Sequence, residues 1–277
     1  MTKFDKTHLS ISSGLRTGMI HRDYIAHCFR WEFAAKFSRY RSEPFPKNPT
    51  ILDIGCGKDL PYYSVLCGNS HGNKPTHYYG VDLNKVALPE NRKSSPIPST
   101  LFSETNFLDL TEEQVPGVTQ ITSFEVLEHC PAAAVRPILK HALKLAPEAT
   151  FLLSTPVWNR KYAARNHCNE MTRDAFGYLL EEVGFAIERN YGTFGDQAPI
   201  LDALDGEAKK LAKKLFEYHH KEVVANMFAP LYPELARNNF WVLTKADDSY
   251  TRKFTSPGTE PWASGNDWRE LLNDKTI

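Results

Sequence analysis

The sequence predicts an α/β fold built on a mainly parallel, seven-stranded sheet with helices on both faces. Two observations predict it. Short apolar runs of strand length alternate along the chain with segments of helical periodicity, as in successive strand–helix–strand units. Several of these runs also end in a glycine, a carboxylate or an amide. In parallel sheets the carboxyl ends of the strands form the edge at which ligands bind.

Composition sets the broad class of the protein. Of the 277 residues, 42% are apolar and 24% are charged, which is ordinary for a globular chain with a sizeable core. Lys plus Arg and Asp plus Glu both number 33, so no global field attracts nucleic acid or an anionic membrane. The cysteines form no CxxC pair, and no segment is long and apolar enough to span a membrane. We therefore expect a soluble cytoplasmic protein without a membrane partner.

The first strand carries the clearest ligand-binding signal. The run Thr50-Ile-Leu-Asp-Ile ends at Gly55-x-Gly57, where the missing Cβ atoms let a ligand approach the backbone. The short helix predicted at Leu60–Leu66 would direct free N–H groups at that ligand. Asp53 could accept from a cationic or hydroxyl-bearing group. A glycine pair alone equally suits a tight strand-to-helix turn.

Polar groups at later strand ends strengthen this signal. Asp53, Asp82, Asn106 and Glu125 all fall at carboxyl ends of predicted strands. A carboxylate at the end of the second strand is where a ribose diol is usually held, although Asp82 could instead cap the following turn. The further strands are predicted at residues 77–83, 101–110, 120–129, 150–155, 185–189 and 240–245, with helices at 132–146 and 172–183.

Four parts are expected along the chain. Aromatic residues at helical spacing between His21 and Arg41 predict a helix that covers the core or forms a lid over a substrate. Helical patterning predicts helices over 201–220 and around 223–227. Residues 1–18 are polar and are expected to form a flexible lead or a short arm, and Trp262 and Trp268 are expected to dock a polar tail. The parts are an N-terminal helical arm or lid (1–48), a core (49–194 and 239–247), a helical insertion expected to cap the substrate (195–238) and the C-terminal tail (248–277).

The ordered set of motifs resembles the class I S-adenosylmethionine-dependent methyltransferases. The segments ILDIGCG, YYGVDL, ETNFLDL and SFEVLEH follow one another in the order of that family, over about residues 48–190 plus the final strand. The resemblance implies a Rossmann-like fold and S-adenosylmethionine as the cofactor. Where the family often has a third glycine, this sequence has Lys58-Asp59.

The resemblance also implies which residues bind the cofactor. The two glycines approach its methionine part, with Asp53 near the amino group, and Asp82 binds the ribose hydroxyls with Leu83 beside the adenine. Asn106 and Phe107 take the place where the family holds the adenine edge. The implied cofactor-binding residues are Asp53, Gly55, Gly57, Asp82, Leu83, Asn106, Phe107 and Phe124.

The segment after the fourth strand bears on the methyl acceptor. Phe124-Glu-Val-Leu-Glu-His-Cys130 lacks the [DN]PP[YFW] motif of enzymes that methylate amino groups of DNA bases and the Pro-Cys nucleophile of cytosine C5 enzymes. Its Glu-Val-x-Glu-His pattern resembles the ubiquinone-biosynthesis O-methyltransferases and the small-RNA 3′-terminal 2′-O-methyltransferases. In both, this segment is associated with a divalent metal that binds the acceptor oxygens.

Four residues are therefore candidates for catalysis and for metal binding. Glu125, Glu128 and His129, joined by His167 from a later loop, could hold Mg²⁺, Mn²⁺ or Zn²⁺. The first three are also candidates for the base that removes the acceptor's proton. Alternatively, Glu128 and His129 only orient the following helix, and His167 is a lone loop histidine near the substrate.

Three functions remain open. The first is methyl transfer to oxygen, or less readily nitrogen, of a small molecule or nucleotide by positioning and general-base catalysis, with or without a metal. The second is methylation of RNA or DNA, with helix 21–41 and the lysines of 209–214 as an electrostatic track, which zero net charge does not favour. The third is a non-catalytic binding protein of the same fold. The sequence identifies neither the acceptor nor the oligomeric state.

Overall fold

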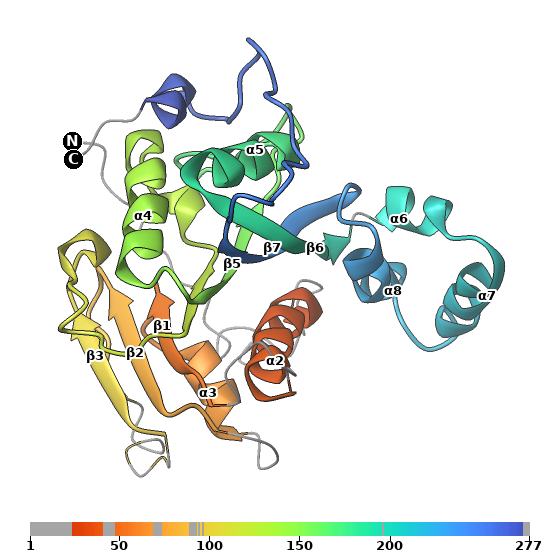
Figure 1. Cartoon of the computed structure of the whole chain (residues 1–277). Helices are drawn as coiled ribbons and strands as arrows, with labels where there is room; N and C mark the ends of the chain where they lie inside the picture. Colours follow the sequence, from red (N-terminus) through yellow and green to blue (C-terminus); the bar gives the residue numbers. More distant parts are fainter. Residues whose placement is uncertain are drawn as a thin grey trace.

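The computed structural model describes residues 24–40, 48–68, 74–88, 93, 95, 97–195 and 197–273. Within them, seven strands form one sheet in the order β3-β2-β1-β4-β5-β7-β6 (Figure 1). β7 runs antiparallel to both of its neighbours, and the other pairings are parallel. The strands are β1 (Thr50–Ile54), β2 (His77–Asp82), β3 (Ser99–Ser103), β4 (Gln120–Phe124), β5 (Thr150–Pro156), β6 (Phe185–Gly195) and β7 (Ala236–Lys245). The predicted fold class is confirmed.

Helices cover both faces of the sheet. One apolar cluster joins one face to α4 and α5, and a second joins the other face to α2 and α3 (Figure 1). The α-helices are α2 (Tyr24–Tyr40), α3 (Pro61–Gly68), α4 (Ala132–Leu145), α5 (Arg173–Val183), α6 (Gln197–Ala203), α7 (Gly206–Leu215) and α8 (Lys221–Phe228). No helix in these described stretches is long and apolar enough to cross a membrane.

Local sequence signals set the ends of α5. The Thr172 side chain accepts a hydrogen bond from the N–H of Ala175, which satisfies one of the free donors of the first turn. Gly184 follows the last turn at φ 113°, in the left-handed region that glycine enters without strain. The predicted end of this helix is therefore confirmed. The expected lead of residues 1–18 lies outside the described residues.

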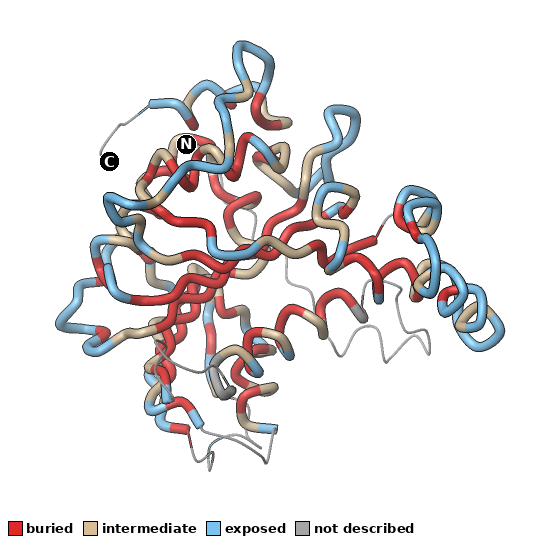
Figure 2. Tube along the Cα trace, turned by 45° about the vertical axis from the view of Figure 1, so that its right-hand side comes forward, coloured by how far each residue is buried: buried red, intermediate tan, exposed pale blue. Residues whose placement is uncertain are grey.

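The insertion differs from the expected pattern. A helix was predicted over 201–220, but α6 begins at Gln197 and a break at Leu204–Asp205 separates it from α7. The break follows from Gly206, which adopts φ 44° at the start of α7. β6 and β7 are also longer than predicted, because their register shifts interrupt the alternation that marks a strand. α6 and α7 project from the sheet, and most of their residues are exposed (Figures 1 and 2).

The C-terminal tail is docked as predicted. Trp262 and Trp268 are buried and belong to the same apolar cluster as α4 and α5. Residues 262–264 also lie along the loop that leads into α5. Ser264 donates its N–H to the carbonyl of Glu170 (2.9 Å), and Thr172 donates its N–H to the carbonyl of Trp262 (3.1 Å). The tail therefore braces a loop at the carboxyl edge of the sheet.

Candidate functional site

The glycine turn after β1 has a backbone conformation that favours glycine over larger residues. Gly55 and Gly57 have φ angles of 68° and 69°. A Cβ on Gly55 would lie 2.4 Å from Cγ2 of Val126, far inside van der Waals contact. In place of a third glycine, Lys58 and Asp59 form a turn that is closed by the N–H of Leu60, which donates to the carbonyl of Gly57 (3.1 Å). The turn therefore forms without the third glycine.

A cavity of about 130 Å³ lies beside this turn, at the ends of β1 and β2. Asp82 is buried in its wall, where its Oδ2 accepts from the N–H of Gly57 (2.9 Å) and its Oδ1 from the N–H of Asn84 (2.8 Å). These bonds join the second strand to the glycine turn. Five of the predicted cofactor residues meet here: Gly55, Asp82, Leu83, Asn106 and Phe107.

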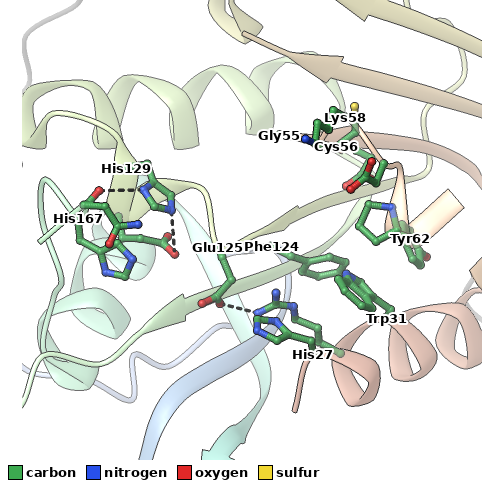
Figure 3. A pocket seen from close by; sticks show the side chains of 17 residues that line it. His27, Trp31, Gly55, Cys56, Lys58, Tyr62, Phe124, Glu125, His129 and His167 are labelled. Atoms are coloured by element: carbon green, nitrogen blue, oxygen red, sulfur yellow. Dashed lines mark hydrogen bonds and ion pairs between the residues drawn. The ribbon is translucent and has the colours of Figure 1, made fainter. Parts of the chain in front are cut away.

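A second cavity, of about 390 Å³, adjoins the first and contains the other three predicted cofactor residues, Asp53, Gly57 and Phe124 (Figure 3). Gly55, Glu125 and His129 line both cavities. In Figure 3 the glycine turn and Tyr62 lie on one side of Glu125, and His129 and His167 lie on the other. Glu125 therefore lies between the part of the site that contains the glycine turn and the part that contains His129 and His167.

Asp53 is buried and fully engaged by its neighbours. Its Oδ2 accepts from the hydroxyl of Tyr78 and its Oδ1 from the hydroxyl of Thr122, both at 2.6 Å. Burial raises the pKa of Asp53 to about 6, and the two hydrogen bonds oppose that rise because they stabilise the carboxylate. The side chain thus binds β2 and β4 to β1 beneath the cavity.

This pKa predicts a specific pH dependence of stability. Because the pKa of Asp53 rises on folding from 3.8 to about 6, its stabilising contribution is complete below pH 3.8 and is lost as the pH rises through 6. At about 1.4 kcal/mol per pKa unit, the loss is on the order of 3 kcal/mol. Urea unfolding between pH 4 and 7 should show the wild type losing stability relative to Asp53→Asn. A pH-independent difference between the two proteins would contradict this assignment.

Three of the four predicted metal ligands come together at the far side of the larger cavity. Glu128 and His129 lie on the 3₁₀ turn η3 (Leu127–His129), and His167 lies on the loop before α5. One ligand atom from each lies within 4.8 Å of the others. Glu128 is 1% exposed, and neither carboxylate oxygen has a hydrogen-bond partner among the described residues. Burial, together with the charge of Glu125, raises its pKa well above the usual range.

Oxygen acceptors hold the outer nitrogen of each imidazole. Nδ1 of His129 lies 3.1 Å from the carbonyl of Asn166, and Nδ1 of His167 lies 2.6 Å from Oε1 of Glu170. A proton on each Nδ1 leaves Nε2 as the atom with a lone pair, and Nε2 of His129 is 3.9 Å from Oε1 of Glu128. Carboxylate–histidine pairs of this kind orient metal ligands in proteins. One buried carboxylate without a donor and two oriented imidazoles therefore fit a divalent cation.

The loop that carries His167 is fastened to η3 by main-chain contacts. The N–H groups of Cys168 and Asn169 donate to the carbonyl of Glu128 at 2.7 and 3.1 Å. The buried amide of Asn169 donates to the carbonyls of Leu127 and Cys130 at 3.1 and 2.6 Å. Two segments about 40 residues apart in the sequence are thereby held together.

Glu125, the fourth predicted ligand, is engaged elsewhere. It has φ 56°, and its carboxylate accepts from Oγ of Ser154 (2.8 Å) and from Nδ2 of Asn238 (2.6 Å). Nη1 of Arg30, on α2, lies 3.0 Å from its Oε1. The structure therefore groups Glu128 with the two histidines and places Glu125 in a separate cluster with Arg30.

Sequence reasoning did not identify Arg30 or Glu170. Arg30 occupies the same face of α2 as His27 and Trp31, and all three line the larger cavity. A charged residue on the apolar face of a predicted helix was the available signal. Glu170 follows His167 at a spacing of three in Asn166-His-Cys-Asn-Glu, and a carboxylate so close to a candidate ligand was the corresponding signal.

The fold and these two cavities define a class I S-adenosylmethionine-dependent methyltransferase. Adjoining pockets lie at the carboxyl edge of a parallel sheet, with a glycine turn after β1, a carboxylate at the end of β2 and an antiparallel β7. The sequence model of the methyltransferase-domain family matches residues 25–190, and the chain belongs to this family. Its cofactor is S-adenosylmethionine.

Comparison with solved structures agrees with this fold. The small RNA methyltransferase HEN1 superposes with a TM-score of 0.53 and 17% identity over 86% of this chain, which spans only 27% of the HEN1 chain. The methyltransferase domain of bacterial CtHen1-C superposes with a TM-score of 0.51 and 16% identity, over 82% of this chain and 100% of that domain. At these identities the likeness shows the fold alone. Comparison with curated protein sequences gives no significant match.

The placement of Asp82 leads to a direct test of the cofactor site. If Asp82 binds the ribose hydroxyls, as the resemblance implies, Asp82→Ala should weaken binding of S-adenosylhomocysteine, the demethylated cofactor, by about 1–3 kcal/mol, because a charged acceptor is lost. Titration calorimetry measures this change. The exposed Asp248→Ala serves as a matched control and should bind as the wild type does. Unchanged affinity in Asp82→Ala would contradict the ribose assignment.

Proposed function

We propose that this methyltransferase transfers the methyl group to a hydroxyl oxygen of a small molecule or nucleotide, and that a divalent cation at Glu128, His129 and His167 binds the acceptor oxygens. The observation that carries the proposal is the buried carboxylate of Glu128. No described residue donates a hydrogen bond to it, and it lies beside two oriented imidazoles in the same cavity as the glycine turn. An unpaired buried carboxylate is costly unless a cation or a proton joins it.

The chain itself supplies positioning and a base. The sulfonium of the cofactor is already a strong electrophile, so holding the acceptor oxygen in line with the methyl group is the main requirement. Glu125 lines both cavities and is oriented by Ser154, Asn238 and Arg30, which supports a role for it as the base that accepts the proton of the hydroxyl. A divalent cation in the site would act as a Lewis acid on the acceptor oxygen.

The acceptor is a hydroxyl with a second oxygen next to it, since two neighbouring oxygens chelate a cation better than one. A ribose 2′,3′-diol and a catechol both have this chemistry. RNA is the second candidate, because the solved structures compared above include a small RNA methyltransferase. The expected electrostatic track gives it little support, since Arg30 is buried and Lys210 forms an ion pair with Glu207.

The capping role of the insertion also stays a prediction, because described residues of 195–238 line neither cavity.

Methyl transfer from tritiated S-adenosylmethionine tests the proposal. Catechols, nucleotides with a free 2′,3′-diol and short RNA with a terminal diol are each offered with Mn²⁺, with Mg²⁺ or with EDTA. We expect transfer to the hydroxyl of one small acceptor class and its loss with EDTA. The matched control is the 2′-deoxy or mono-hydroxy analogue of each acceptor, which should not react. Transfer that ignores EDTA would contradict the metal, and transfer to RNA alone would favour the second candidate.

A further inference from the structure

Arg30 has more hydrogen-bond donors than its described surroundings use. Its side chain is 4% exposed and lines the larger cavity; Nε has no hydrogen-bond partner in the described part of the chain, and Nη1 contacts only the carboxylate of Glu125. A guanidinium carries five N–H donors and no acceptor. The ion pair, 3.0 Å from Nη1 to Oε1 of Glu125, leaves the N–H of Nε without an acceptor among the described residues. Buried donors in this state require an acceptor.

Glu125 contacts Nη1 of Arg30, and no acceptor among the described residues reaches Nε. Its two oxygens already accept from Ser154 and Asn238, at 2.8 and 2.6 Å, which fixes the carboxylate against β5 and β7. Asp53 is likewise held by Tyr78 and Thr122. Because Arg30 lines the cavity, a molecule that enters the cavity can supply the acceptor that Nε lacks among the described residues.

The position of α2 places the guanidinium of Arg30 in the wall of the larger cavity. His27, Arg30 and Trp31 share one helix face, and the helix packs against α3, α8 and β6. Arg30 therefore lines the same cavity as the glycine turn and the His129–His167 pair. Lys58, the other cation of the cavity wall, is exposed to water, so Arg30 offers a buried charge with little competition from solvent.

We propose that Arg30 is the oxyanion-binding residue of this cavity and receives a carboxylate or phosphate group in a forked, charge-assisted contact. The proposal rests on the cavity being the cofactor site. Two sources carry this chemistry: the α-carboxylate at the amino-acid end of the cofactor, and an anionic group of the acceptor. Either one would complete the donors that Glu125 leaves open.

Titrating Arg30 variants with a full and a shortened ligand tests whether Arg30 binds the carboxylate of the cofactor. Wild type, Arg30→Gln and Arg30→Lys are titrated with S-adenosylhomocysteine and with 5′-methylthioadenosine, which lacks the amino-acid end. If the cofactor carboxylate binds Arg30, Arg30→Gln should lose about tenfold or more in affinity for S-adenosylhomocysteine and less than about twofold for methylthioadenosine. Arg30→Lys should lie between, because it keeps the charge but not the fork.

Inorganic phosphate tests the second source. With the cofactor site saturated by S-adenosylhomocysteine, phosphate should raise the Tm of the wild type and not that of Arg30→Gln if the acceptor supplies the anion. The proposal is overturned if Arg30→Gln changes neither the preference for S-adenosylhomocysteine over methylthioadenosine nor the response to phosphate. Should Arg30→Gln fail to fold, the same two comparisons are made with Arg30→Lys, and an unchanged outcome overturns the proposal equally.

A second buried arginine, away from the cavity, serves as the control that separates effects on ligand binding from effects on stability. Arg136, on α4, is also buried, and its Nε donates to the carbonyl of Leu271 at 3.1 Å, away from the cavity wall. Arg136→Gln should lower Tm and leave both ligand affinities in their wild-type ratio. If the wild type binds no S-adenosylhomocysteine at all, the proposed function fails, whereas the phosphate comparison, made without that ligand, still decides whether Arg30 binds an oxyanion.

Discussion

Glu128→Gln should abolish binding of Mn²⁺ and at the same time stabilise the metal-free protein. The loss of binding follows from removing the charged ligand of the cluster, and we expect the affinity to fall by more than about a hundredfold. The gain in stability, on the order of 1–3 kcal/mol in the free energy of unfolding, follows because Glu128 must take up a proton or bury an unsatisfied charge on folding, and a neutral amide does neither. Calorimetry with Mn²⁺ and urea unfolding in EDTA measure the two effects.

Glu181 provides a matched control for this prediction. Its carboxylate is buried to a similar degree, but it accepts from the hydroxyl of Tyr250 (2.8 Å) and from the N–H groups of Lys253 (2.7 Å) and Phe254 (3.0 Å). Glu181→Gln should therefore lose stability and leave Mn²⁺ binding unchanged. If Glu128→Gln behaves like Glu181→Gln, then Glu128 is a structural residue and the cation site is wrong.

Gly55→Ala should remove much of the protein's margin of stability and prevent cofactor binding. The added Cβ would meet Cγ2 of Val126 at 2.4 Å and would also hold a non-glycine residue at φ 68°. The backbone term alone costs about 1–2 kcal/mol, and overpacking adds about 1–3 kcal/mol. Urea unfolding and calorimetry with S-adenosylhomocysteine give the two readouts.

Gly117→Ala separates the backbone cost of a positive φ from the steric cost of contact with Val126. It has nearly the same φ, 70°, and no atom of the described residues lies within 4 Å of the place that an added Cβ would take. Gly117→Ala should therefore show only the backbone cost. Adding Val126→Ala to Gly55→Ala should recover the steric part. Equal losses in Gly55→Ala and Gly117→Ala would show that contact with Val126 plays no role at this turn.

The sheet and the cofactor side of the site could be predicted because their determinants are local. Asp53, Gly55 and Gly57 follow one another at the end of β1, and Asp82 ends the next strand, so strand order alone brings them to one edge. His129 was a candidate by resemblance and His167 by its place in a loop at the same sheet edge, but the geometry of the pair depends on Asn169 and Glu170, whose roles need the folded loop.

The surroundings of Glu125 could not be predicted in the same way. Its three partners, Arg30, Ser154 and Asn238, come from a helix and two strands spread over more than 200 residues of sequence. No periodic pattern encodes such a cluster, because it arises only when β7 pairs with β5 and α2 packs beneath them. The same holds for the break between α6 and α7, which depends on one glycine within a helical pattern.

The hydrogen bonds between residues 262–264 and the loop that carries His167 also set the order in which parts of the site can form during protein synthesis. A nascent chain that has emerged as far as β7 already contains every strand of the sheet and the whole glycine turn. The hydrogen bonds from Ser264 to Glu170 and from Thr172 to Trp262 can form only after a further stretch has left the ribosome. The pocket lined by the glycine turn and Asp82 can thus form before residues 262–264 emerge, whereas the carboxylate that orients His167 is secured only after they have emerged.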